Sequence, residues 1–313
     1  MIGRKKAVRQ HTLLKDLRSN RIYLLLLIPA ILYVVIFSYI PMGGVVIAFK
    51  NYNYSAGIFG SPWVGLKNFR FLIISNKLWT LTRNTLSYNF VFIVLEMFLE
   101  VAFAVIINEM RCKWFKKTFQ SFMFLPFFIS WVVAVAVIQT MLDYDNGLIT
   151  RMVESFGGEM VNIYTTSGPW PYLLVLFHAW KGVGYGSIIY LSAIANIDQE
   201  MYEAAEIDGA NSWQKVFRIT IPNLVPTMVI MFLLAVGQIF RGDFGMFYQL
   251  IGDNGVLLEA GDILDLYVYR AMSSGTNLGM SAAAGLYQSV LCFFTVVTVN
   301  YIVKRIQPDY TLF

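Results

Sequence analysis

Charged residues are scarce in this sequence: Asp, Glu, Lys and Arg supply 14% of the 313 residues, while 57% are hydrophobic. A soluble domain carries about 25% charged and roughly 45–50% apolar residues. The charges that are present gather in short stretches between long apolar runs, which is the segregation that a bilayer imposes. The composition therefore argues against a soluble protein and predicts an integral membrane protein.

Cysteine and histidine are also scarce, with two of each. Cys112 and Cys292 form no CxxC pair, which argues against a disulfide framework or a zinc site, and His11 and His178 make no metal or catalytic cluster. The sequence lacks a G-x-x-x-x-G-K-[ST] phosphate loop and a nucleophile with a partner base. We therefore expect no catalytic residue, no metal site and no cofactor in this chain.

The net charge of +5 does not indicate a nucleic-acid partner, because Lys and Arg lie beside hydrophobic stretches and no separate soluble basic domain is visible. The first apolar run follows Arg4, Lys5 and Lys6 as in a signal peptide, but no small-residue cleavage site comes after it. We expect this run to be a retained first helix.

A membrane-spanning helix needs about 20 apolar residues, and this length predicts about six spans. They cover residues 22–39, 88–107, 119–141, 171–195, 224–240 and 281–303. Each run is apolar throughout, whereas the strands of a β-barrel would alternate with a period of two. The predicted fold is therefore all-α, with six transmembrane helices in a single domain over residues 22–313.

The distribution of Lys and Arg predicts the orientation of these spans. Cations are concentrated in a tail over residues 1–21, in residues 111–117, at Lys215 and Arg218, and in residues 304–305. Because such segments stay on the cytoplasmic side, both termini are expected in the cytoplasm.

Three connections on the opposite side are too long for simple turns, so we expect them to form a structured external cap. They cover residues 50–83, 143–168 and 241–280. Residues 50–83 carry five cations, which departs from the charge rule.

One short segment between the fourth and fifth spans has strong local helix signals. Asp198 is placed to cap a helix that runs through Ile207, and Gly209 is placed to end it in a left-handed conformation. Asn211 with Gln214 has the pattern of a capping box for a second helix. The segment is therefore predicted to be a helix-turn-helix at the cytoplasmic face.

The side chains of the first helix suit it to dock on another protein. Ala204 and Ala205 keep the helix slim enough to enter a groove, while Glu203, Glu206 and Asp208 offer carboxylates to a basic partner. An ordinary amphipathic helix at the membrane surface is the simpler alternative, since E-A-A is a common helical triplet.

This segment resembles the EAA loop of ABC importer permeases, which runs E-A-A, then G, then I-x-L-P at this spacing. Ile221 stands where that pattern has Leu, which preserves an apolar contact. The resemblance implies a type I ABC importer permease fold in which residues 198–222 form the coupling helix that enters a cleft of the ATPase. The residues expected to make that contact are Glu203, Ala204, Ala205, Glu206, Asp208, Gly209, Ala210, Ile219 and Pro222.

A second resemblance lies in the first external connection. Its core W-V-G-L-x-N-F, within residues 51–69, is similar to the first external loop of sugar permeases. The N-Y-N-Y run before it, with residues 261–270, resembles permeases that import oligosaccharides released from plant or algal polysaccharides.

Together the resemblances imply a permease in a bacterial cell membrane that translocates a sugar or oligosaccharide. The implied partners are a second homologous permease, a cytoplasmic ATPase dimer that holds ATP and Mg, and an extracytoplasmic solute-binding protein. The chain itself would be no enzyme.

Sugars are held by aromatic faces and by polar groups that bond their hydroxyls, so both were sought inside the spans. The candidates are Trp180, Lys181, Tyr185 and Tyr190 in the fourth span, and Gln238, Arg241, Asp243 and Phe244 at the outer end of the fifth. The alternative is that these side chains pack the bundle or lie in the interfacial belt.

Glu96 and Glu100 lie one helical turn apart in the second span, so they share a face that must avoid lipid. Structural pairing with a polar group on another helix is the favoured reading. The alternative is a proton relay, which would make the chain a proton- or ion-coupled secondary transporter.

Overall fold

The part of the chain that the structure describes is helical. The computed structural model describes residues 20–74, 76–158, 162–275 and 278–306. Within these ranges the sole β pairing is an isolated bridge between Lys50 and Trp63. The all-α prediction is confirmed.

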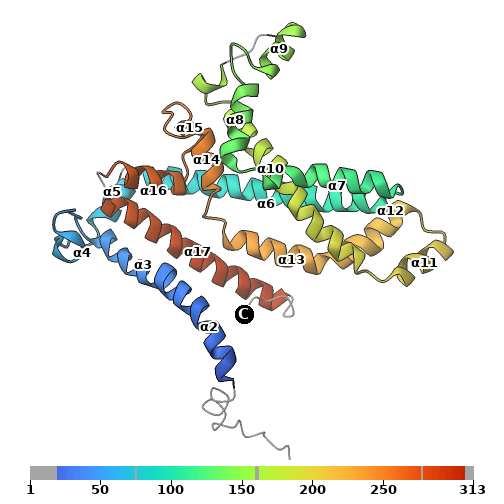
Figure 1. The fold of residues 1–313 in the computed structure, drawn as a ribbon, viewed down its shortest axis with the longest axis horizontal. Helices are drawn as coiled ribbons and strands as arrows, with labels where there is room; N and C mark the ends of the chain where they lie inside the picture. The colour runs from blue at the N-terminus through green and yellow to red at the C-terminus, as the bar shows by residue number, and fades with distance from the viewer. Residues whose placement is uncertain (1–19, 75, 159–161, 276–277, 307–313) are drawn as a thin grey trace, which may run out of the picture.

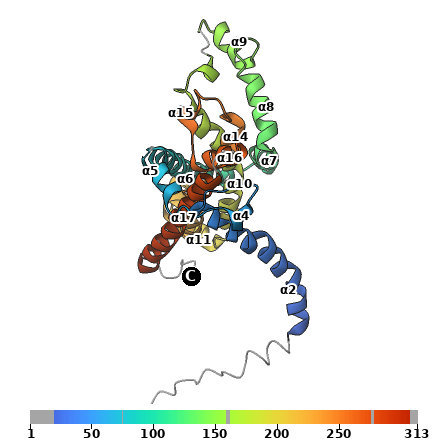
Figure 2. The ribbon, with the colours of Figure 1, turned by 90° about the vertical axis from the view of Figure 1, so that its left-hand side faces the viewer.

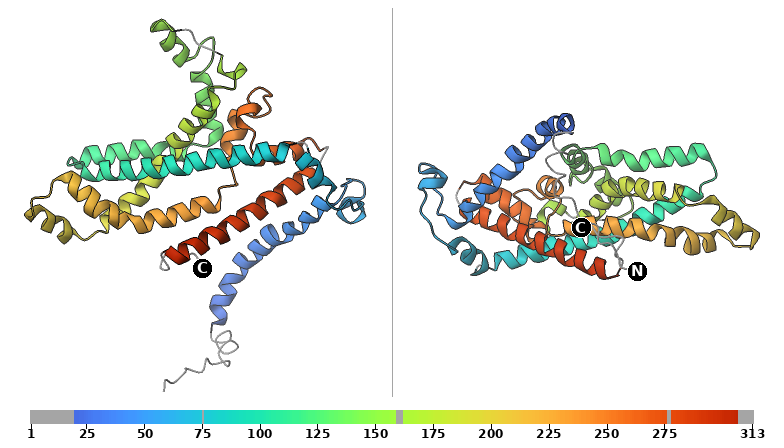
Figure 3. Two further views of the ribbon diagram at one scale, coloured as in Figure 1. Left: turned by 180° about the vertical axis from the view of Figure 1, so that it is seen from behind. Right: turned by 90° about the horizontal axis from the view of Figure 1, so that it is seen from below.

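Five helices lie side by side and form the body of the molecule (Figures 1 and 3). They are α6 (Lys77–Glu109), α7 (Lys113–Phe128), α10 (Trp170–Ala195), α13 (Ile221–Gly237) and α17 (Leu278–Ile306). The short helices α11 (Gln199–Ile207) and α12 (Ser212–Lys215) lie together at one end of this bundle (Figure 1). The hairpin predicted from local signals therefore projects from the bundle end.

Glycines on α10 allow its close approach to α6 and α7. A Cβ on Gly184 would lie 1.9 Å from the backbone oxygen of Met123, and one on Gly186 would lie 1.8 Å from Oε1 of Glu100. Small residues at such contacts let helix backbones approach closely in membranes. The three helices consequently pack as one unit around α10.

The amino-terminal part of the first span leaves the bundle (Figure 2), while its carboxy-terminal end packs on α17. It runs continuously through α2 (Arg21–Val34), η1 (Val35–Tyr39), α3 (Ile40–Met42) and η2 (Gly43–Phe49). None of its apolar window is buried against the rest of the chain. This span is therefore longer than the predicted residues 22–39; α2 and η1 are exposed, whereas Ala48 of η2 is fully buried against α17.

The predicted third span over residues 119–141 is divided into two helices. Helix α7 ends at Phe128, and α8 (Trp131–Met141) departs from it with a bend of 102°. Pro126 lies in the last turn of α7, and the Ser130 hydroxyl accepts a hydrogen bond from the backbone N–H of Val133, which caps α8. These local signals divide a run that is apolar throughout.

The count of six spans is not confirmed. Among the described residues, four helices are long and apolar enough to cross a membrane, or five if the bent pair α7–α8 is one span. Helix α10 is 26 residues long but is absent from that set. His178, Lys181 and several glycines lower its hydropathy and keep it outside that set, although apolar runs at residues 173–177 and 188–195 lie on both sides of them.

The fifth span begins earlier than residue 224. Helix α12 continues through the π-helical turn η4 (Val216–Thr220) directly into α13, and residues 212–237 together form one candidate span. Pro222 lies in the interior of this continuous helix, directly after the π-helical turn, and such local adjustment accommodates a proline that lacks a backbone N–H. The second helix of the hairpin is thus continuous with the membrane helix that follows it.

The long connections that were predicted to be structured fold into short helices. They contain α4 (Gly57–Gly60), α5 (Lys67–Ile74), α9 (Leu148–Ser155), η3 (Ile163–Thr165), α14 (Phe244–Leu250), α15 (Leu258–Gly261) and α16 (Leu264–Ser273). Trp170 is fully buried beneath them and donates from Nε1 to the Ile163 carbonyl at 2.7 Å. We call these connections the outer cap.

A buried ion-pair cluster attaches the outer cap to α6. Asp262 is 2% exposed, and its two carboxylate oxygens lie 2.5 Å from Nζ of Lys77 and 2.5 Å from Nη2 of Arg270. Asn84 donates to the Asp262 carbonyl at 3.2 Å, and Tyr88 donates to the Ala260 carbonyl at 2.7 Å. One face of α6 therefore holds residues 260–262 in place.

Candidate docking surface and transport path

The first helix of the hairpin ends as its sequence predicts. The Asp198 carboxylate accepts from the backbone N–H of Glu200 at 3.0 Å and caps α11. At the other end Gly209 has φ +80°, and the Ala210 N–H donates to the Ala205 carbonyl at 2.8 Å. This is the glycine-terminated arrangement common at helix C-termini.

The second helix begins with the predicted capping box. The backbone N–H of Gln214 donates to the Asn211 side chain at 2.9 Å, and the Asn211 N–H donates to the Gln214 side chain at 2.8 Å. Both ends of the connection between α11 and α12 are therefore fixed by local hydrogen bonds.

The hairpin is fixed to the root of α13 by a tertiary contact. The hydroxyls of Tyr202 on α11 and Thr220 on η4 lie 2.9 Å apart, and Tyr202 and Ile219 pack against a core that contains Leu224. These partly buried contacts couple α11 to the start of α13.

The carboxylates of α11 are not equivalent. Glu206 forms a 2.6 Å ion pair with Lys215 of α12, and the hydrogen bond from that ammonium lowers the pKa of Glu206. Among the described residues no ion pair engages Glu203 or Asp208, and both are exposed. Glu206 thus closes the hairpin, while Glu203 and Asp208 face outward.

Exposed apolar side chains at the tip were not predicted from the sequence. Ile207 is 88% exposed, and Trp213 is 72% exposed and stacks on Phe217 at 6.0 Å between ring centroids. In a polar helical segment, an isolated Ile and Trp are the signal that could have found them. They give the tip an apolar centre beside the two outward carboxylates.

Lys181, a candidate for the substrate path, lies at the break between α7 and α8. Its ammonium donates to the carbonyls of Pro126, Phe127 and Ile129 at 3.3, 3.0 and 2.7 Å. These carbonyls belong to the end of α7, where helical partners are missing. Lys181 therefore stabilises the bend, and Tyr185 one turn later stacks on Phe127 at 4.5 Å.

The remaining candidates of α10 differ in exposure. Trp180 is 44% exposed, whereas Tyr190 is fully buried in the core that joins α6, α10 and α13. The structure therefore leaves Trp180 and Tyr185 open to a partner or ligand and encloses Tyr190.

The candidates after α13 lie at the start of α14. The Asp243 carboxylate accepts from the Met246 N–H at 3.1 Å and from the Trp131 indole at 2.7 Å, so it caps α14 and ties it to α8. Phe244 packs against aromatic neighbours, Gln238 ends α13, and Arg241 is exposed.

Glu96 and Glu100 face α10. Oε1 of Glu96 lies 2.8 Å from Nδ1 of His178 without the alignment of a hydrogen bond, and the Glu100 carboxylate rests against Gly186. Both glutamates line a cavity of about 120 Å³ together with Tyr190 and three residues of α13: Met231, Phe232 and Ala235. Both carboxylates thus turn toward other helices of the bundle.

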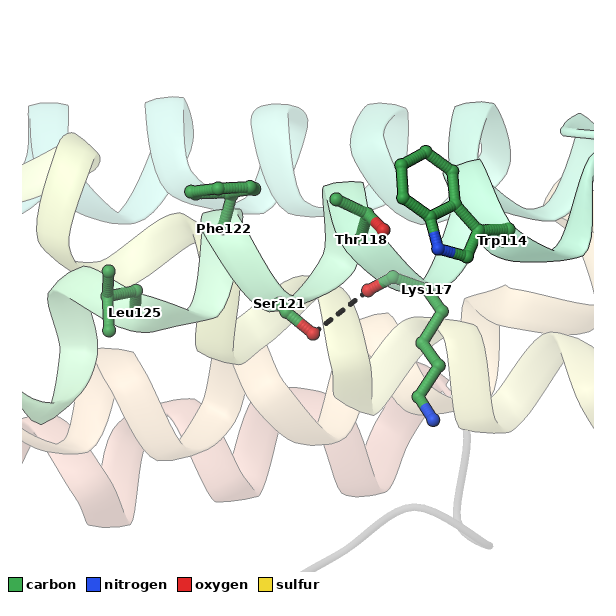
Figure 4. Close-up of a pocket in the computed structure, with 6 residues that line it drawn as sticks. All are labelled: Trp114, Lys117, Thr118, Ser121, Phe122 and Leu125. Carbon is green, nitrogen blue, oxygen red and sulfur yellow. Dashed lines mark hydrogen bonds between the residues drawn. The ribbon is translucent and has the colours of Figure 1, made fainter.

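The groove drawn in Figure 4 lies elsewhere, on the face of α7. It measures about 500 Å³ and is lined by Trp114, Lys117, Thr118, Ser121, Phe122 and Leu125. All six residues come from one face of a single helix, and most are exposed. It is a surface groove separate from the candidates above.

A bundle of apolar helices that presents a fixed, exposed hairpin at one end is the architecture of a membrane transport subunit that docks another protein. The comparisons with known proteins agree. The chain belongs to the family of binding-protein-dependent transport system inner membrane components, whose model matches residues 100–308. It is therefore an ABC importer permease, a multi-pass membrane subunit and not an enzyme.

Two curated relatives and one solved structure match this chain over nearly its full length. A polygalacturonan/rhamnogalacturonan transport system permease protein, YteP of Bacillus subtilis, is 33% identical over 96% of this chain and 93% of its own. Protein LplB of the same organism is 32% identical over 94% and 92%. A bacterial ABC transporter involved in the import of the acidic polysaccharide alginate superposes with a TM-score of 0.87 at 29% identity, covering 95% of this chain and 100% of that one.

Proposed function

We propose that this chain is the permease of an ATP-driven importer for oligosaccharides released from a polysaccharide. The observation that carries the proposal is the hairpin of residues 198–222, which is joined to the start of α13 by the Tyr202–Thr220 contact and exposes Glu203, Ile207 and Asp208. The relatives named for polygalacturonan/rhamnogalacturonan, alginate and arabinooligosaccharides support the class of substrate.

The proposed partners are a second homologous permease, a cytoplasmic ATPase dimer that binds ATP and Mg, and an extracytoplasmic solute-binding protein. A similar alginate transporter has been solved with an alginate pentasaccharide-bound periplasmic protein, which supports the last of these. In this arrangement the hairpin and both termini face the cytoplasm, and the outer cap receives the binding protein.

The geometry supports a lever mechanism. Closure of the ATPase dimer would displace α11, and the Tyr202–Thr220 contact would pass this displacement to η4 and α13. Because α12, η4 and α13 form one continuous helix, the movement would reach Gln238 at its far end and the connection to Arg241 beyond it. The substrate path would open there. Family membership leaves the proton-coupled alternative without support, and the glutamates on which it rested turn toward α10 and α13.

The decisive experiment is uptake of a labelled oligosaccharide by the reconstituted complex in vesicles supplied with internal ATP and an uncoupler. Uptake that requires ATP and persists after collapse of the proton gradient is expected. Uptake that stops with the uncoupler and needs no ATP would refute the proposal. A ligand screen on the partner binding protein would then identify the sugar.

A further inference from the structure

Three aromatic rings form an open cluster on the outer cap. Phe244 and Tyr248 of α14 stack at 5.3 Å between centroids, and Tyr269 of α16 lies 5.0 Å from Phe244 and 4.8 Å from Tyr248. The Tyr248 and Tyr269 hydroxyls lie 3.5 Å apart. Tyr269 is 38% exposed and the other two are half-buried. Ring faces and hydroxyls are therefore accessible together.

The backs of these helices are firmly packed. Met246 and Phe247 are fully buried on the opposite side of α14, and Leu264 and Leu266 are fully buried on α16. The Asp243 side chain caps α14 at the residue before Phe244. The three rings are thus held in position by the core, and little side-chain entropy remains to be lost when a ligand binds.

A second group of rings continues the cluster toward α10. Trp131 is hydrogen-bonded to Asp243 and packs over Gly245, where an added Cβ would approach its ring to 3.0 Å. The Lys181 ammonium lies between the Trp131 and Phe127 rings, 5.5 and 5.7 Å from their centroids. Tyr185 stacks on Phe127 and is 45% exposed.

Six rings from five helices thus form one row, which runs from the outer cap to the middle of α10. Within the row, Asp243 connects Trp131 to the rings of α14, and the Lys181 ammonium connects Trp131 to Phe127. The row consists of Tyr269, Tyr248, Phe244, Trp131, Phe127 and Tyr185. Each ring is at least partly exposed, and polar groups lie beside the rings: two hydroxyls at the outer end and a phenol at the inner end.

We infer that this row is a binding track for a linear oligosaccharide, on which Tyr248 and Tyr269 bind the sugar units that enter last. The inference rests on the proposed function. Pyranose rings present apolar C–H faces that stack on aromatic rings and hydroxyls that bond to phenols at the ring edges. A row of several rings can contact several sugar units of one oligosaccharide at the same time. A disaccharide would contact only part of the row.

The test uses the complete reconstituted complex with saturating binding protein, and compares digalacturonate with a longer oligogalacturonide as probes. In the Tyr248→Ala/Tyr269→Ala variant, uptake of the longer probe should fall about fivefold, the effect of one to two lost aromatic contacts. Uptake of digalacturonate should stay near the wild-type rate. The Tyr248→Phe/Tyr269→Phe variant keeps the rings and should retain most uptake of both probes.

Tyr172→Ala is the matched control, because this tyrosine is 80% exposed on α10 and has no place in the row. Unchanged uptake of the longer probe by the double Ala variant would overturn the binding track but leave the proposed function intact. Equal loss for both probes, or weaker binding of the solute-binding protein, would also overturn it and would assign the cluster to protein docking. Lack of ATP-dependent uptake by the wild-type complex would instead refute the proposed function, and the track with it.

Discussion

Replacing Asp262 should loosen the attachment of the outer cap to α6. Its carboxylate is 2% exposed and holds both Lys77 and Arg270 at 2.5 Å. Removing one partner of a buried ion pair costs about 3–5 kcal/mol, because a charge is left uncompensated. The Lys77 side chain is 40% exposed and can be solvated, whereas that of Arg270 is only 18% exposed. The expected cost for Asp262→Ala is therefore about 3 kcal/mol, at the low end of that range.

The assay is thermal unfolding of the purified complex in detergent, read by loss of the folded monodisperse species. Asp262→Ala should lower the unfolding temperature clearly, and Asp253→Ala, an exposed aspartate of the same cap, should not. A double-mutant cycle with Arg270→Gln isolates the pair, and we expect a coupling of at least about 1 kcal/mol. Additive effects, or equal stability of the Asp262 and Asp253 variants, would refute the argument.

Four further substitutions test other contacts. Gly209→Val should abolish uptake while insertion persists, because a β-branched residue resists φ +80°, and Gly209→Asn should retain uptake. Glu203→Lys should reduce co-purification of the ATPase, and wild-type stoichiometry in high salt would contradict this. Lys181→Met should destabilise the bend by about 2 kcal/mol in thermal unfolding, since three carbonyls lose a charged donor. Glu96→Gln should retain ATP-driven uptake and lose about 1 kcal/mol of stability, whereas loss of uptake in an assembled complex would contradict a purely structural role for Glu96.

The hairpin could be predicted residue by residue because its determinants are local. Asp198, Gly209 and the Asn211–Gln214 capping box act within a few residues of one another, so their spacing in the sequence is their spacing in the structure. The tertiary contact that makes the hairpin useful, between Tyr202 and Thr220, spans 18 residues and left no comparable signal.

The membrane spans were less predictable, because hydropathy reports how apolar a segment is and not the direction in which its helix runs. Residues 131–138 are as apolar as any membrane helix, yet they leave α7 at 102°. Only Pro126 and Ser130 mark the break, and the Lys181 side chain that stabilises it comes from another helix. Conversely, α10 is at the centre of the bundle but too polar for the hydropathy criterion.

For the substrate path, the sequence could indicate which residue types to expect, but not which side chains lie next to one another in the folded protein. Phe244 was found from its position after the fifth span, whereas Tyr248 and Tyr269 were missed because nothing in the sequence shows that rings 21 residues apart meet. Aromatic rows are assembled by tertiary packing, so they become visible only once α14 and α16 are placed.

The two ends of the molecule are connected through the same helices. The outer part of α6 holds the cap through Asn84 and Tyr88, while its middle packs along α10, the helix with which it makes its most extensive contact. At the opposite end α11 is tied to α13, and α13 packs against both α6 and α10. Along this route, within the residues that the structure describes, each helix is in direct contact with the next. A displacement of α11 must therefore either move the cap or break one of these contacts, which is the property that energy coupling across the membrane requires.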